Sequence, residues 1–193
     1  MPEIDTDGAI RAFIQDAHTI VAEHDGQIDD ASLEDIAHRM KGIAEWKNLE
    51  QLAEAARERG ERLYSEPDGG FQLMLAHFPS ITAVHTHGTW GVMAAHKGTE
   101  WYRQYTREDD GSKDGEARLK LVREIHIEPG HIGWWYSPPN DIHQQVPDPG
   151  GAWELIMMGE PPASERLYFD LDHHTYMRDT PAARHYQVDQ PPN

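Results

Sequence analysis

The chain has no cysteine among its 193 residues, which excludes a disulfide framework. Positive charge is scarce, since 17 lysines and arginines stand against 34 acidic residues and give a formal net charge of −17. This surplus argues against nucleic acid and anionic membranes as partners. No apolar run is long enough for a membrane span, and the start, MPEIDTDGAIRAF, lacks the pattern of a signal peptide. We therefore expect a cytoplasmic protein, monomeric or a small homo-oligomer, folded as one domain.

Histidine is abundant by contrast, with 13 residues. His85 and His87 stand one residue apart in the β-like segment AVHTHGTWG, and His143 follows in SPPNDIHQQ. Alternate side chains of a strand point the same way, so both imidazoles of the pair share one face. The three residues therefore predict a three-histidine metal site. Neutral imidazole suits zinc, copper, nickel and ferrous iron alike, so the histidines do not name the metal.

Glycine and proline divide the surrounding sequence into short strands. From about Phe71 onward, β-like runs alternate with Gly and Pro turns, as in a double-sheet barrel. Residues 92–95 form an apolar run that ends at a turn around Gly98. Residues 107–117, REDDGSKDGEA, read as the polar tip of a hairpin.

Together these segments resemble the cupin superfamily: a His-x-His pair, a glycine turn, and a proline-rich turn that ends in one histidine. Gly91 stands where most metal-binding cupins carry a glutamate ligand. That substitution, with HTHGTWG and YSPPNDIHQ, is similar to the cysteine dioxygenase type I family of thiol dioxygenases over about residues 62–160. The resemblance implies a mainly β fold, a cupin double-stranded β-helix (jelly-roll) barrel, with an N-terminal α-helical segment and Fe²⁺ held by three histidines.

The implied activity is that of a non-heme iron thiol dioxygenase, which adds both atoms of O2 to the sulfur of a small thiol and gives a sulfinate. Three neutral ligands leave the full charge on the metal, which favours a thiolate in an open position. Two alternatives keep the fold. One is a three-histidine cupin acting on a non-thiol, such as a dicarbonyl dioxygenase or a zinc hydrolase. The other is a non-catalytic cupin that binds a small ligand.

Some features of that family have no counterpart. Gly60 or Glu61 stands where the family has a carboxylate-binding arginine, so Arg59 and Arg62 are the adjacent candidates for substrate binding. The serine, histidine and tyrosine of the family's relay align with three other residues, Glu154, Ile156 and Met158. We therefore expect a substrate other than cysteine.

Aromatic residues cluster near the motifs and supply further candidates. We expect Trp90 to exclude water and Tyr102, Tyr105 or Tyr136 to relay protons. The expected substrate pocket has aromatic walls and an acidic group, and its candidates are Trp134, Tyr136, Glu154 and Met158. Such a pocket favours a cationic thiol, namely an aminothiol or a betaine thiol such as ergothioneine. Asp141 or Gln144 is expected to orient a ligand ring.

The N-terminal region reads differently from the rest. Residues 1–63 are expected to form helices that pack on the barrel of residues 64–162, because each helix has one apolar stripe. Ser32 and Asp35 suggest a capping box at the second helix. Residues 163–193 are expected to add a strand or lid and a frayed tail, with His173 and His174 on the surface.

Overall fold

A computed structural model describes residues 6–24, 26, 28–159 and 163–180. The frayed end expected at residues 189–193 lies outside this part of the chain. The described residues begin with three helices: α1 (Thr6–Glu23), α2 (Asp30–Ala44) and α3 (Leu49–Glu58). Eleven strands follow: β1 (Tyr64–Ser65), β2 (Gln72–Phe78), β3 (Val84–His85), β4 (Gly91–Lys97), β5 (Glu100–Arg107), β6 (Leu119–Ile127), β7 (Ile132–Trp135), β8 (His143–Pro147), β9 (Ala152–Met158), β10 (Arg166–Asp170) and β11 (Thr175–Asp179).

The strands form two antiparallel sheets, in the order β1-β2-β9-β4-β7 and β11-β10-β3-β8-β5-β6. Four antiparallel pairs are nested in sequence, β2 with β9, β3 with β8, β4 with β7 and β5 with β6. Nested pairs that alternate between two sheets are the topology of the jelly roll, or double-stranded β-helix. The mainly β fold with N-terminal helices is thus the one that the sequence predicts.

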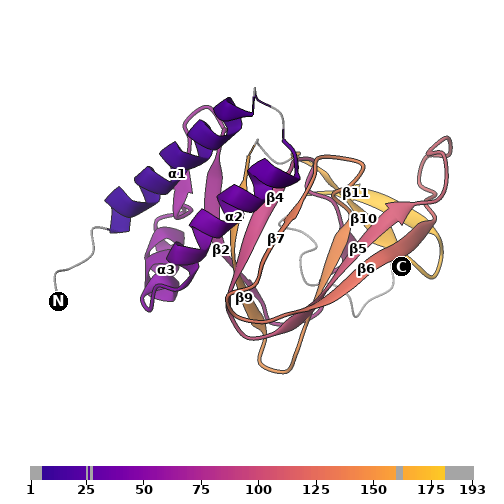
Figure 1. Cartoon of the computed structure of the whole chain (residues 1–193). Coiled ribbons are helices and arrows are strands. Elements are labelled where there is room, and N and C mark those ends of the chain that lie inside the picture. Colours follow the sequence, from indigo (N-terminus) through magenta and orange to yellow (C-terminus); the bar gives the residue numbers. More distant parts are fainter. Residues whose placement is uncertain (1–5, 25, 27, 160–162, 181–193) are drawn as a thin grey trace.

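The helices cover the outer face of the five-stranded sheet (Figure 1). Side chains of β4 alternate between two cores: Val92 and Ala94 pack with the helices, whereas Met93 and Ala95 face the barrel interior. This is why residues 92–95 are apolar throughout, since both faces of the strand are buried. None of the described helices is long and apolar enough to cross a membrane.

The start of α2 differs from the expectation. Asp29 is the N-cap, and its carboxylate accepts a hydrogen bond from the backbone N–H of Ser32 at 2.9 Å. In return the Ser32 hydroxyl accepts from the Asp29 N–H at 3.0 Å. The capping box therefore joins Asp29 and Ser32, and its pairing with Asp35 is wrong. The carboxylate at residue 29 caps the helix, so the helix begins earlier than the serine pattern predicts.

The end of the described chain completes the six-stranded sheet. β10 pairs with β3 on one side and with β11 on the other. His173 and His174 lie in the turn that joins β10 to β11, where both are exposed. The His173 ring pairs with Asp170 at 2.8 Å.

Candidate metal centre

The three predicted histidines come together inside the barrel. His85 and His143 are paired residues of neighbouring strands, and His87 follows β3 by two residues. All three are at most 5 % exposed. The Nε2 atom of His87 lies 3.1 Å from that of His85 and 3.1 Å from that of His143. Ligand atoms at about 2.1 Å from a shared ion lie about 3 Å apart, so the triad fits a metal ion.

Hydrogen bonds hold the ring of His85 and the backbone of His87 in place. The His85 ring pairs through Nδ1 with the carbonyl oxygen of Ala83 at 2.9 Å. A ring that donates from Nδ1 keeps the lone pair of Nε2 for a metal, as is usual for metal-binding histidines. Asp141 acts on the backbone, because its carboxylate accepts from the N–H groups of His87 at 2.9 Å and Gly88 at 2.7 Å.

Gln144 does not reach a ligand ring. Its Nε2 donates to the carbonyl of Thr82 at 2.9 Å, and its Oε1 accepts from the Tyr105 hydroxyl at 3.3 Å. Tyr105 packs with Val84 and Ile142, the neighbours of His85 and His143 in the sequence, on the face of the six-stranded sheet that points away from the triad. Asp141, by contrast, holds the loop that carries His87. Burial raises the pKa of Asp141, and the two backbone hydrogen bonds lower it.

A tryptophan ring fills the place next to Gly91. Gly91 is paired with Trp135 across the strands, and a Cβ added to the glycine would meet Cζ2 of that ring at 2.2 Å. The Trp135 ring centroid lies 5.2 Å from those of His87 and His143. Within the described residues, the group of possible metal ligands consists of the three histidines alone. Trp135 therefore supplies an apolar wall where a ligand carboxylate has no room.

Two histidines of the triad, His85 and His143, belong to a row of polar residues that crosses five neighbouring strands. Strand register pairs Tyr168 with His85, His85 with His143, His143 with Gln104 and Gln104 with Arg123. Paired residues of adjacent strands point to the same face of a sheet. The row thus extends the triad by Tyr168 on one side and by Gln104 and Arg123 on the other.

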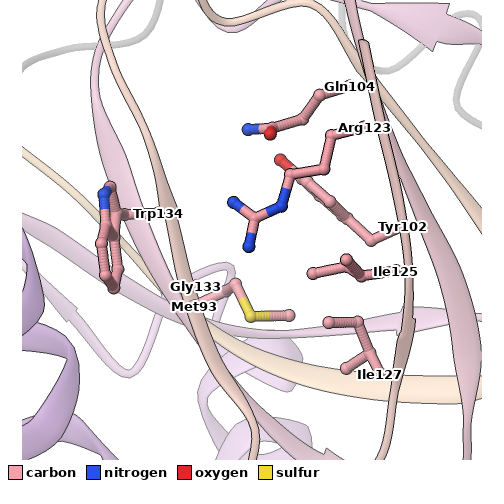
Figure 2. A pocket seen from close by; sticks show the side chains of 8 residues that line it. All are labelled: Met93, Tyr102, Gln104, Arg123, Ile125, Ile127, Gly133 and Trp134. Carbon is pink, nitrogen blue, oxygen red and sulfur yellow. The ribbon is translucent and has the colours of Figure 1, made fainter. Parts of the chain in front are cut away.

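A pocket opens beside this row, between β4 and β7 on one side and β5 and β6 on the other. It encloses about 270 Å³, part of which is open to solvent. Figure 2 shows Tyr102, Gln104 and Arg123 pointing into it. The remaining walls are mostly apolar and come from five residues: Met93, Ile125, Ile127, Gly133 and Trp134.

Sequence reasoning missed Gln104 and Arg123. The available signal was alternation, because Arg123 shares the inward side of its strand with Ile125 and Ile127, which line the same pocket. A basic residue in such a position marks a functional candidate. The identity of its neighbours depends on strand pairing, which the alternation alone does not give.

The two candidate tyrosines of β5 lie on opposite faces. The Tyr102 ring lies 5.3 Å from the His143 ring, centroid to centroid, with its hydroxyl buried. Burial raises the pKa of Tyr102 well above 10, and the nearby Glu154 and Glu100 raise it further. Tyr105 instead packs in a cluster with Val84 and other residues outside the barrel interior. Of the two, only Tyr102 is placed next to the triad.

Three predicted aromatic residues lie on the helix-covered face. Trp90 packs against Phe71 with ring centroids 5.8 Å apart. The Trp134 indole donates to Asp30 at 3.0 Å, and the Tyr136 hydroxyl donates to the same carboxylate. Trp134 and Tyr136 thus attach the start of α2 to the sheet. Trp90 and Tyr136 do not face the triad, whereas Trp134 also lines the pocket.

The predicted arginines lie apart from the pocket. Arg59 is exposed and forms an ion pair with Glu61 at 2.7 Å. Arg62 lies nearer to the barrel, where burial lowers its pKa. Its charge acts on Arg166, a buried residue of β10 that faces the same way as Tyr168.

Two buried carboxyls lie at the other end of the barrel interior. Glu154 and Glu100 are at most 1 % exposed. Burial raises the pKa of Glu100 to about 7, and burial with the neighbouring Glu100 raises the pKa of Glu154 well above its usual value. Glu154 stands four residues before Met158, which pairs with Gly91 near the triad. That spacing corresponds to about 13 Å along a strand.

No protein-family model matches the chain, and no curated protein matches its sequence. Among solved structures, hydroquinone 1,2-dioxygenase from Sphingomonas sp. TTNP3 shares 10 % identity at a TM-score of 0.38, over 47 % of this chain and 60 % of that one. The chain therefore spans less than two thirds of that protein's length.

Two other structures match at a similar level. Oxalate decarboxylase from Bacillus subtilis, solved at pH 4.6, shares 15 % identity at a TM-score of 0.35, over 57 % of this chain and 24 % of that one. An uncharacterised protein with a double-stranded β-helix domain from Klebsiella pneumoniae shares 13 % identity at a TM-score of 0.35. The match covers 53 % of this chain and 76 % of that one. Similarity at this level assigns no activity to the chain.

Proposed function

We propose that this protein is a non-heme iron thiol dioxygenase with His85, His87 and His143 as its metal ligands. The observation that carries the proposal is the convergence of three buried Nε2 atoms without a carboxylate in the group. Ferrous iron bound by three neutral imidazoles keeps its full charge and has open positions for a thiol and for O2.

The overall reaction is balanced without a further reactant. One thiol, R–SH, and one O2 give one sulfinate and one proton. Two sulfur–oxygen bonds form, the O–O bond and the S–H bond break, sulfur is oxidised and dioxygen is reduced. The iron would supply the positions in which sulfur and oxygen meet.

The protein contributes orientation and exclusion of water. Asp141 holds the backbone of His87, and the Ala83 carbonyl fixes the His85 ring. Trp135 and Tyr102 lie against the histidine rings and keep one side of the triad apolar. Such walls exclude water that would compete with the reactants.

The predicted positive charge of the substrate thiol depends on the charge of two buried carboxyls, Glu100 and Glu154. The sequence favours a cationic thiol because of Glu154 and its aromatic neighbours. Raised pKa values mean that Glu100 and Glu154 together carry less negative charge at neutral pH than two free carboxylates. They also lie well away from the triad. The electrostatic support for a cationic thiol is therefore weak, while a small thiol remains the proposed substrate. The cytoplasmic location and the oligomeric state stay predictions.

The test is oxygen uptake by the iron-loaded protein with a panel of thiols, followed by mass analysis of the product. The panel contains cysteine, 3-mercaptopropionate, cysteamine, mercaptosuccinate and ergothioneine. We expect one thiol to consume equimolar O2 and to gain two oxygen atoms, both labelled when ¹⁸O2 is supplied. If the purified protein contains zinc instead of iron, the zinc hydrolase becomes the assignment. If oxygen is consumed only with dicarbonyl compounds, the dicarbonyl dioxygenase becomes the assignment. Iron-loaded protein that is inert with both classes would reject the dioxygenase.

A further inference from the structure

Asp141 is a buried carboxylate that holds the backbone of a metal ligand through one of its two oxygens. Its Oδ2 atom accepts from the N–H groups of His87 and Gly88. Within the described residues its Oδ1 atom has no hydrogen-bond partner, although the residue is only 1 % exposed. A buried carboxylate is costly unless a positive charge compensates it. The support of His87 therefore calls for a cation close to Asp141.

Arg166 is the cation that acts on this carboxylate. It is 7 % exposed, and within the described residues its Nε and Nη1 atoms have no hydrogen-bond partner. Burial raises the pKa of Asp141 and lowers the pKa of Arg166, which disfavours both charges. Each charge opposes this effect on the other residue, because Arg166 lowers the pKa of Asp141 and Asp141 raises that of Arg166. The two buried charges therefore stabilise each other.

Strand β10 places Arg166 beside the histidine pair. Tyr168 is paired with His85, and Arg166 stands two residues before Tyr168, so both side chains leave the same face of the strand. Thr86, between the two histidines, binds Leu167 twice. Its N–H donates to the Leu167 carbonyl at 3.1 Å, and its hydroxyl accepts from the Leu167 N–H at 3.0 Å. These bonds fix β10 against the segment that carries both ligands.

We infer that Arg166 is a positioning residue of the metal centre, which acts through Asp141 on the backbone of His87. Its charge compensates the carboxylate that binds the N–H groups of His87 and Gly88, and hydrogen bonds to a charged acceptor are the stronger ones. Arg166 thus helps to keep the His87 ring within reach of the other two ligands, and the role requires no contact with substrate. The inference rests on the metal ligands of the proposed function and not on its reaction.

Asp179 is a second carboxylate on the same face as Arg166. The two residues are paired across β10 and β11, and paired residues of adjacent strands point to one side of the sheet. However, Asp179 is partly exposed and stands on the edge strand β11. Asp141 is buried, so a charge acts on it with less screening by water. We therefore assign Asp141 as the partner through which Arg166 acts.

The first experiment measures the affinity of the protein for Co²⁺, a metal that imidazole binds and whose visible absorption bands respond to ligand geometry. We expect R166M to weaken Co²⁺ binding by about 10- to 100-fold, the range for the loss of an outer contact at a metal site, and to shift the bands. R166K keeps the positive charge and should restore most of the affinity and the original bands. R166Q replaces R166M if circular dichroism shows that R166M is unfolded.

The control for this experiment is R103M, which removes an arginine of the same sheet that pairs with Glu124. We expect R103M to bind Co²⁺ as the unaltered protein does and to keep its absorption bands. Equal Co²⁺ affinity of R166M and R103M would overturn the inference. An R166K variant that binds as weakly as R166M would also overturn it, because the charge would then not be the property that matters.

A double-mutant cycle tests whether Arg166 acts through Asp141. D141N should weaken Co²⁺ binding by a similar factor, and R166M should add little to that loss, because the charge that it compensates is already gone. In the D179N background R166M should keep its full effect. A full additional loss from R166M in the D141N background would show that the two residues act independently. An effect that disappears in D179N would assign the role to the other carboxylate.

The ligand variant H143A separates this inference from the proposed function. If H143A and R166M both bind Co²⁺ as the unaltered protein does, the assigned metal ligands are wrong and the inference fails with them. If H143A alone loses Co²⁺, the ligands stand and Arg166 has no positioning role. If R166M weakens Co²⁺ binding as expected but no thiol consumes oxygen with the iron-loaded protein, the positioning role stands and the dioxygenase fails.

Discussion

The two ends of the barrel interior bury opposite kinds of ionisable group. One end holds the three histidines with Trp135 beside them, whereas the other holds Glu100 and Glu154. The groups belong to neighbouring strands, since Glu100 stands four residues before Gln104 on β5, and Gln104 is the partner of His143 on β8. The same interior therefore contains a basic end suited to a metal ion and an acidic end kept about 13 Å away from it.

This separation has an electrostatic consequence. Coulomb energy falls with distance, so a carboxylate about 13 Å from an ion stabilises it far less than a carboxylate bound to it. The triad end can thus keep a metal at nearly full positive charge. At the acidic end, no ion pair to either carboxyl forms within the described ranges, and burial favours their protonated forms. The two ends therefore suit different occupants, a metal cation at the histidines and bound protons at the carboxyls.

The largest expected effect concerns the basic end. H143A removes one of three ligands and should lower the bound metal at least tenfold, because even the loss of an outer contact costs about 10- to 100-fold in affinity. Metal content after dialysis, measured by mass spectrometry, checks this. H38A removes an exposed helix histidine and is the control. Metal retained by H143A at the level of H38A would contradict the assigned ligands, provided that circular dichroism shows both variants folded.

A smaller effect, on the stability of the fold, is expected at Gly91, where the Trp135 ring takes the space of a ligand carboxylate. G91A places a Cβ 2.2 Å from Cζ2 of the Trp135 ring, so the ring or the strand must shift. We expect a loss of about 1–3 kcal/mol in the free energy of unfolding, measured by urea denaturation. G42A adds the same methyl group to α2 with nothing within 4 Å and should stabilise by up to about 1 kcal/mol. Equal stability of G91A and the unaltered protein would show that this end is loosely packed.

The smallest expected effect concerns the acidic end, where Glu100 and Glu154 make the stability of the fold depend on pH. Glu100 has a pKa of about 7 in the folded protein against 4.5 ordinarily, and the pKa of Glu154 is also raised. Between these values the folded state binds more protons than the unfolded state, so stability falls as pH rises from about 4.5 to about 7. E154Q removes one of the two ionisations, so the loss of stability between these pH values should be smaller in E154Q than in the unaltered protein.

Urea denaturation at several pH values measures that slope. E58Q, at an exposed position of α3, is the control and should keep the slope of the unaltered protein. A slope in E154Q as steep as in E58Q would mean that the two carboxyls do not share their environment. The comparison between the two ends would then lose its electrostatic basis.

The sequence predicted more of the fold than of the site. Alternation and turn residues are local signals, so the barrel, the helices and the face shared by His85 and His87 were predictable. Tyr102 and Tyr105 stand three residues apart, so alternation places them on opposite faces of one strand, but it does not tell which of the two faces the barrel interior. A register shift lies between Gln104 and Tyr105 in the pairing of β5 with β6, and Tyr105 packs outside the barrel interior. Trp90 and Tyr136 likewise looked available but pack toward the helices.

By itself, the sequence determined that a histidine pair would share one face of a strand, that no disulfide would form, and that an amphipathic helical segment would precede short strands. Tertiary structure alone decided that Arg123 stands in one row with His143, that Trp135 fills the space beside Gly91, and that Glu100 meets Glu154. The physical reason is the range of the interactions. Periodicity acts between residues a few positions apart, whereas strand register joins residues that are distant in the chain.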